Sequence, residues 1–131
     1  MTPPVLVIIS DRTDWEPPCL DVIRAAVPSR LYVAVICSPE KGDTTAPCEK
    51  ARATVAAVDR PFELRTFVRV GSFGERLALV NAVTWFFQNE PEGLVLQDDC
   101  VPAPEFFSFC EWALAAYRDE KRVWHVNARN L

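Results

Sequence analysis

The segment that decides the fold is Gly93-Leu-Val-Leu-Gln-Asp-Asp-Cys-Val-Pro102. Its apolar run Leu94–Gln97 predicts a short buried strand, and two carboxylates, Asp98 and Asp99, come directly after it. Taking a carboxylate out of water is costly, so such a pair needs water, backbone N–H groups, an arginine or a hard metal ion. Two interpretations stay open: a metal site, or one aspartate that caps the next turn while the other faces water.

Apolar runs and helical spacings alternate along the rest of the chain. The runs predict strands at Val5–Ile9, Leu31–Cys37, Phe62–Val70, Leu94–Gln97 and Val123–Val126. Helical spacing predicts helices at Cys19–Val27, Cys48–Val58, Glu75–Asn89 and Phe106–Tyr117. Such alternation is typical of parallel strands joined by right-handed crossovers. We therefore expect an α/β fold in one domain over residues 1–131, with three layers and a mainly parallel sheet that carries helices on both faces.

Polar side chains come after the predicted strands. Asp11 stands next to Ser10 at the end of the first strand, and Asp98 and Asp99 come after the fourth. In an open parallel sheet, ligands bind beyond the carboxyl ends of the strands. The topology therefore gives the metal interpretation of the two aspartates a location, at the rim where these ends meet.

Composition and charge narrow the function. The net charge is −4 and no run of lysine or arginine exists, which argues against nucleic acid or an acidic membrane surface as the partner. The run Val5–Ile9 is too short for a signal peptide or a membrane span, so we expect a cytoplasmic protein. The 5 cysteines show no C-x-x-C spacing and His125 is the single histidine, which argues against a zinc site or a disulfide framework.

Two common α/β families are excluded by the residues after the first predicted strand. A receiver domain needs its acid pair there, whereas the chain has Ser10-Asp11-Arg12. A dinucleotide-binding domain needs G-x-G-x-x-G there, and no glycine lies between Met1 and Lys41.

The segment Leu94–Glu111 resembles the acid-motif region of nucleotide-diphospho-sugar transferases with the GT-A fold, in particular small relatives of the family 2 glycosyltransferases. In that group the strand ends in Glu-Asp-Asp-Cys, a proline comes next, and a helix carries Phe-Phe-x-Phe-Cys. The corresponding residues are Gln97-Asp-Asp-Cys100, Pro102 and Phe106-Phe-Ser-Phe-Cys110. Weaker similarity covers Leu31–Ala34, Gly74 with Arg76, and Ala82–Phe87. The resemblance implies the nucleotide-binding half of a GT-A fold.

In that family the acid motif holds Mg²⁺ or Mn²⁺, which bridges the diphosphate of a nucleotide sugar and stabilises the leaving group. By this resemblance, Asp99 is the metal ligand, and Asp98 lies beside it toward the ribose or sugar. Arg76 matches a basic position that reaches phosphate, and Asp11 faces the nucleobase or ribose. The implied function is a glycosyltransferase-like protein that binds a nucleoside diphosphate or nucleotide sugar through the metal.

The chain departs from the family pattern at three places. Gln97 replaces the first acid of the motif, and Cys37-Ser38-Pro39 stands where the family has an aspartate. The chain ends at Leu131, before the acceptor site and the catalytic base of the family. No catalytic residue is therefore identified, and we expect no sugar transfer by this chain alone. The alternative is a non-catalytic, truncated GT-A-like module for binding or assembly.

Aromatic side chains predict self-association. Apolar residues cover most of the circumference of Phe106–Tyr117, and Trp85, Phe86 and Phe87 cannot all point inward. Exposed aromatic surface beside an open sheet edge favours a symmetric homodimer. Two other arrangements stay open: the loops 38–47 and 127–131 cover the surface, or the aromatic side chains are well packed.

Overall fold

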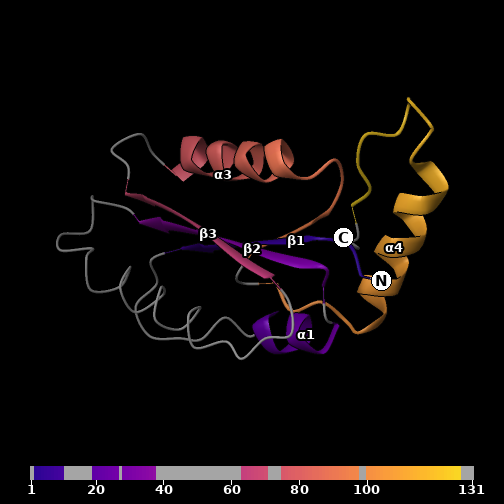
Figure 1. The fold of residues 1–131 in the computed structure, drawn as a ribbon, viewed down its shortest axis with the longest axis horizontal. Coiled ribbons are helices and arrows are strands. Elements are labelled where there is room, and N and C mark those ends of the chain that lie inside the picture. Colours follow the sequence, from indigo (N-terminus) through magenta and orange to yellow (C-terminus); the bar gives the residue numbers. More distant parts are fainter. Residues whose placement is uncertain are drawn as a thin grey trace.

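The computed structural model describes residues 2–10, 19–26, 28–37, 63–70, 75–97 and 100–127. These residues form an α/β fold (Figure 1). The strands are β1 (Val5–Ser10), β2 (Arg30–Cys37), β3 (Glu63–Val70) and β4 (Leu94–Gln97). The helices are α1 (Cys19–Ala26), α3 (Glu75–Asn89) and α4 (Glu105–Tyr117).

The four strands form one parallel sheet in the order β3-β2-β1-β4. The chain adds β2 and then β3 on one side of β1, and after α3 it returns to add β4 on the other side. Val5 lies opposite Leu31 of β2 and Leu94 of β4, so the central strand is paired along both edges. The sequence order of the strands therefore reverses at β1.

Helices pack against both faces of the sheet (Figure 1). One face carries Val5, Val7 and Ile9, which form a core with Ile23 of α1 and Phe107 of α4. The opposite face carries Leu6, Ile8 and Tyr32, which pack with Ala78, Ala82 and Phe86 of α3. Burial on both faces explains the unbroken apolar runs of β1 and β2. The expected three layers and parallel sheet are confirmed for the described residues.

Gly93 lets the chain enter β4 beneath α3. A Cβ atom built at this position would lie 2.7 Å from a ring carbon of Phe86 and 2.9 Å from the carbonyl oxygen of Pro4. The adjacent Leu94 N–H donates to that same carbonyl at 2.9 Å. The absence of a side chain at residue 93 is therefore what allows the core ring and the N-terminal segment to meet here.

The predicted elements that lie in the described residues match to within one residue at either end, with one exception. The predicted strand Val123–Val126 is wrong, because this segment pairs with no strand. Trp124 is 91% exposed, and its indole N–H donates to the carbonyl of Lys121 at 3.0 Å. The segment is thus held by a local turn and contributes little to the core. The predicted helix Cys48–Val58 lies outside the described residues.

None of the helices in the described part of the chain has the length and apolar character needed to cross a membrane.

Candidate functional site

The carboxyl ends of the strands form the rim where the sequence predicts a site. β1 ends at Ser10 beside Ile36 of β2, and β4 ends at Gln97 beside Ile8 of β1. Neighbouring strands lie about 4.8 Å apart, so the chain leaves β1 and β4 from adjacent points of the rim. This is also where the sequence order of the strands reverses.

Strand β4 is accessible on the face that carries α3. Leu94 and Leu96 of β4 are buried on the opposite face, whereas Val95 and Gln97 are exposed. Directly after the strand, the N–H of Cys100 donates to the carbonyl of Gln97 at 3.1 Å, and Cys100 is exposed. The end of β4 therefore offers an accessible edge next to the end of β1.

Of the predicted site residues, the structure places Arg76. It is the second residue of α3, and its side chain is exposed. Asp11, Asp98 and Asp99 lie outside the described residues, so the predicted grouping of these acids with Arg76 stays a prediction. Within the described ranges, no group of three or more His, Cys, Asp or Glu side chains could hold a metal ion. A metal at this rim would depend on Asp98 and Asp99.

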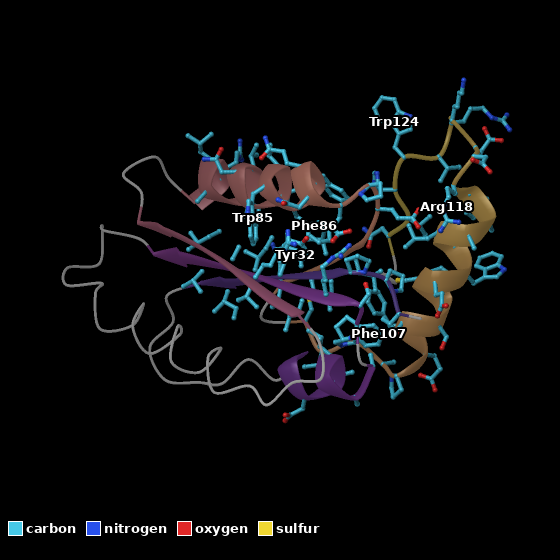
Figure 2. All side chains as sticks on the ribbon, in the orientation of Figure 1. Tyr32, Trp85, Phe86, Phe107, Arg118 and Trp124 are labelled. Carbon is cyan, nitrogen blue, oxygen red and sulfur yellow. The ribbon has the colours of Figure 1, made fainter. Side chains whose placement is uncertain are left out.

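A polar network lies at the opposite ends of the strands. Glu90 stands directly after α3, is buried, and accepts hydrogen bonds from both Arg30 at the start of β2 and the hydroxyl of Tyr32. The Arg30 Nη2 bond measures 2.9 Å and the Tyr32 bond 2.8 Å. The guanidinium of Arg65 lies 5.6 Å from the centre of the Tyr32 ring, in a cation–π arrangement. Figure 2 shows Tyr32 and Phe86 between the sheet and α3.

The pKa values of this network are set by its contacts. The hydrogen bond from Arg30 lowers the pKa of Glu90 and outweighs the opposite effect of burial. Burial, and after it the hydrogen bond to Glu90, raises the pKa of Tyr32. The network therefore contains a charged carboxylate that accepts a hydrogen bond from a neutral phenol. This hydrogen bond connects β2 to the end of α3. In the sequence, the visible signals are charged residues that flank an apolar strand and a helix end.

The same end of the sheet carries a cleft of about 320 Å³ between the segment before β1 and α4. Its polar side chains include Glu92 and Arg118, and the Nε–H of Arg118 donates to the two carboxylate oxygens of Glu92 at 3.0 and 3.2 Å. These contacts raise the pKa of Arg118. The cleft is at the amino ends of β1, β2 and β4, so it is separate from the predicted site.

Helix α4 has an inner and an outer aromatic surface. Phe106, Phe107 and Cys110 pack on the core beneath the sheet. On the outer side, Trp112 is 58% exposed, and its ring centre lies 6.0 Å from those of Phe109 and Tyr117. The predicted exposed aromatic surface is confirmed, whereas the homodimer stays a prediction.

Comparisons with known proteins add a structural similarity. No protein-family model matches the chain, and no curated protein matches it. The chain is similar in structure to Enterococcus italicus Csm6 bound to cyclic hexa-2′-fluoro-hexa-dAMP, with a TM-score of 0.46 and 9% sequence identity. The match covers 91% of this chain and 32% of the Csm6 chain. At this level of similarity, the match assigns no function to the chain.

The assignment to the GT-A glycosyltransferases is wrong. No glycosyltransferase model matches, and the matching structure is a Csm6. The structure supplies a physical reason for the misleading motif. Phe106, Phe107 and Cys110 recur at the spacing that packs α4 on the core, so packing explains three of the four residues of the Phe-Phe-x-Phe-Cys pattern, whereas Phe109 lies on the outer surface. The predicted likeness to half of a GT-A fold and the predicted nucleotide-sugar function rested on that assignment, so they are wrong as well.

Proposed function

We propose that this chain is a non-catalytic binding module that holds a nucleotide-sized, phosphate-bearing ligand at the rim between β1 and β4. The observation that carries the proposal is the strand order β3-β2-β1-β4 in an all-parallel sheet. Ligands of open α/β sheets bind outside the carboxyl ends of the strands, where the strand order reverses. In this chain the reversal lies at β1, beside the exposed end of β4.

The chemistry of the ligand is suggested by the residues next to that rim in the sequence. Asp11 comes after β1, and Asp98 and Asp99 come after β4. Carboxylates bind phosphate groups through a divalent cation, and Mg²⁺ or Mn²⁺ suits oxygen ligands of this kind. Arg76, exposed in the first turn of α3, is a candidate for direct contact with phosphate.

The buried titratable pair of the described residues lies away from the rim. Catalytic acids and bases commonly have shifted pKa values and sit in the cleft where they act. In the described part of the chain, Glu90 and Tyr32 are the buried pair with shifted pKa values. They bond to each other at the amino ends of the strands, away from the rim.

The test is a titration of the ¹⁵N-labelled chain monitored by amide chemical shifts. The probes are ADP, cyclic hexaadenylate and inorganic phosphate, each with and without Mg²⁺. We expect Mg²⁺-dependent shifts at Ser10, Gln97 and Cys100, with a Kd on the order of 0.1–1 mM for at least one nucleotide. The variant Asp99→Asn should abolish them.

The matched control is Asp119→Asn, which makes the same change at an exposed residue just beyond α4. It should bind like the unaltered chain. Unchanged spectra with all three probes, or equal shifts in the Asp99→Asn variant, would contradict the proposed site.

A further inference from the structure

Helix α3 carries a second apolar stripe on the side that faces away from the sheet. Leu77 is 43% exposed, Val80 52% and Phe87 45%, and Thr84, between the last two, is exposed as well. The Thr84 hydroxyl donates to the carbonyl of Val80 at 2.7 Å, so it is already satisfied within the helix. These four residues, termed the outer stripe, are separated by intervals of 3, 4 and 3 residues.

The outer stripe is additional to the face by which α3 packs on the sheet. That inner face buries Ala78, Ala82 and Phe86. A helix that only covers a sheet needs one apolar stripe. The alternating intervals of 3 and 4 are those of a seam between two helices. In Figure 1, no other described helix or strand covers the outer side of α3.

We propose that the outer stripe pairs with the same stripe of a second copy of this chain, with the two α3 helices antiparallel. The stripe is symmetric about residue 82, which suits a twofold axis. Across that axis, Leu77 lies opposite the partner's Phe87, and Val80 lies opposite the partner's Thr84. Leu77 and Phe87 therefore meet an apolar side chain, and Val80 meets Thr84, whose hydroxyl is already bonded within its own helix.

Charge selects the antiparallel orientation. Arg76 lies in the first turn of α3, where the helix dipole disfavours a cation, and the last turn contains no basic residue. Antiparallel pairing places Arg76 at the level of the carboxyl end of the partner helix. The cation is then near the negative end of the partner's helix dipole. Parallel pairing would instead bring two Arg76 side chains and two positive helix ends together.

The expected dimer is weak. A helix of 15 residues is about 22 Å long, so one helix pair buries an area at the low end of specific interfaces. We expect a Kd on the order of 10–100 µM. The interface is distinct from the aromatic surface of α4, because α3 and α4 pack on opposite faces of the sheet.

Sedimentation equilibrium of the full chain over roughly 5–500 µM tests the pairing. Val80→Glu places a charge in the middle of the outer stripe and should raise the Kd at least about tenfold, because unpaired charges in an apolar interface are costly. Trp112→Glu is the matched control on α4, with a similar exposure of 58% against 52%, and should leave the Kd unchanged. Leu77→Gln gives a second, milder variant, and far-UV circular dichroism checks that each variant is folded.

A second pair of variants tests the orientation. Leu77→Cys and Phe87→Cys chains, mixed and oxidised in air, should form a disulfide between the two variants, because residue 77 lies opposite the partner's residue 87 in the antiparallel pair. Parallel pairing would instead join two copies of the same variant. Peptide mapping separates this disulfide from any that the native cysteines form. A monomer at all concentrations, a dimer weakened only by Trp112→Glu, or disulfides only between copies of the same variant would each overturn the proposed antiparallel α3 pair.

Discussion

Replacing Glu90 by alanine should destabilise the fold more than any other single removal of charge in the described residues. Glu90 is 4% exposed and accepts hydrogen bonds from the guanidinium of Arg30 and the hydroxyl of Tyr32. Tyr32 is fully buried. Glu90→Ala therefore removes the charge-assisted bonds and leaves a buried hydroxyl and a guanidinium without this acceptor.

The magnitude depends on how far water can replace the carboxylate. A buried polar group left without a partner costs about 1–3 kcal/mol, and breaking a fully buried ion pair costs about 3–5 kcal/mol. The side chain of Arg30 is 39% exposed, so water can partly rehydrate it, and the lower part of the second range applies. The expected loss for Glu90→Ala is about 3 kcal/mol, a large share of the stability of a small domain.

A double-mutant cycle isolates the contact with Tyr32. Tyr32→Phe alone should cost about 1–2 kcal/mol, because it removes the hydroxyl from a bond to a charged acceptor. In the presence of Glu90→Ala it should cost about 1 kcal/mol less, because the hydroxyl then has no such acceptor to lose. Urea unfolding monitored by circular dichroism and tryptophan fluorescence gives the four free energies of unfolding.

The matched control is Glu92→Ala, two residues further along. Glu92 pairs with Arg118, whose side chain is 56% exposed, so this change should move the urea midpoint only slightly. A loss of unfolding free energy below about 0.5 kcal/mol for Glu90→Ala, or no coupling energy with Tyr32→Phe, would contradict this reasoning. It would show that water replaces the hydrogen bonds of Glu90 at little cost.

Four further predictions concern pH, packing and thiol chemistry. The pKa of Glu90 is lowered, chiefly by the guanidinium bonded to it. Its contribution to stability is therefore present above the ordinary carboxyl pKa of 4.5 and is lost as the pH falls through the pKa of the folded state. Acid titration of the urea midpoint should show this loss, and Glu90→Gln should remove the pH dependence. The pKa of Tyr32 is raised, chiefly by burial. Its contribution to stability is therefore present below pH 10.0 and is lost as the pH rises through the raised pKa. Tyr32→Phe should remove this alkaline loss of stability in the same assay. Gly93→Ala should cost about 1–3 kcal/mol in urea unfolding, because the new methyl group meets a buried phenylalanine ring and a carbonyl oxygen; an unchanged midpoint would mean that both can move at no cost. Burial raises the pKa of the Cys110 thiol, so peptide mapping after iodoacetamide treatment at neutral pH should find Cys110 labelled more slowly than the exposed Cys100, and equal rates would contradict the packing of α4.

The layers of this fold could be predicted because its central strands are buried on both faces. Val5–Ile9 and Leu31–Ile36 are continuous apolar runs, and only a strand covered by helices on both sides uses such runs in a protein of this kind. The end of α3 could be predicted as well, because Pro91 and Gly93 come two and four residues after its last residue. These signals are local, so they can be read from short stretches of the chain.

Contacts between distant segments could not be predicted in the same way. Arg30 and Glu90 are 60 residues apart, and nothing near either residue identifies the other. The segment Val123–Val126 has the composition of an edge strand, but pairing also requires a free sheet edge at the right place. A turn precedes this segment and is closed by a hydrogen bond from the Val123 N–H to the carbonyl of Glu120. After this turn, the segment runs without pairing to a described strand.

The candidate site shows the limit of a local motif. In the sequence, the aspartates after β4 and the aromatic residues of α4 combine into one functional signature. The structure assigns Phe106, Phe107 and Cys110 to the core, which removes most of the specificity of that signature. The remaining feature, Asp98 and Asp99 after a strand at the reversal of the sheet, is a position that many α/β proteins use for different ligands.

Arg76 links the two proposals, and this link has a measurable consequence. It is the candidate phosphate contact at the rim, and it is also the cation that selects antiparallel pairing of α3. One guanidinium that contacts a phosphate is less available to the end of a partner helix. A ligand that engages Arg76 should therefore weaken the dimer, and dimerisation should weaken the ligand by the same factor, because coupling between two binding events is reciprocal. With a typical coupling, saturating Mg²⁺–nucleotide should raise the dimer Kd about 5-fold or more, and Arg76→Gln should abolish that change. A dimer constant that is the same with and without bound nucleotide would mean that Arg76 serves one of the two sites, and the effect of Arg76→Gln on each binding event, measured separately, would then show which.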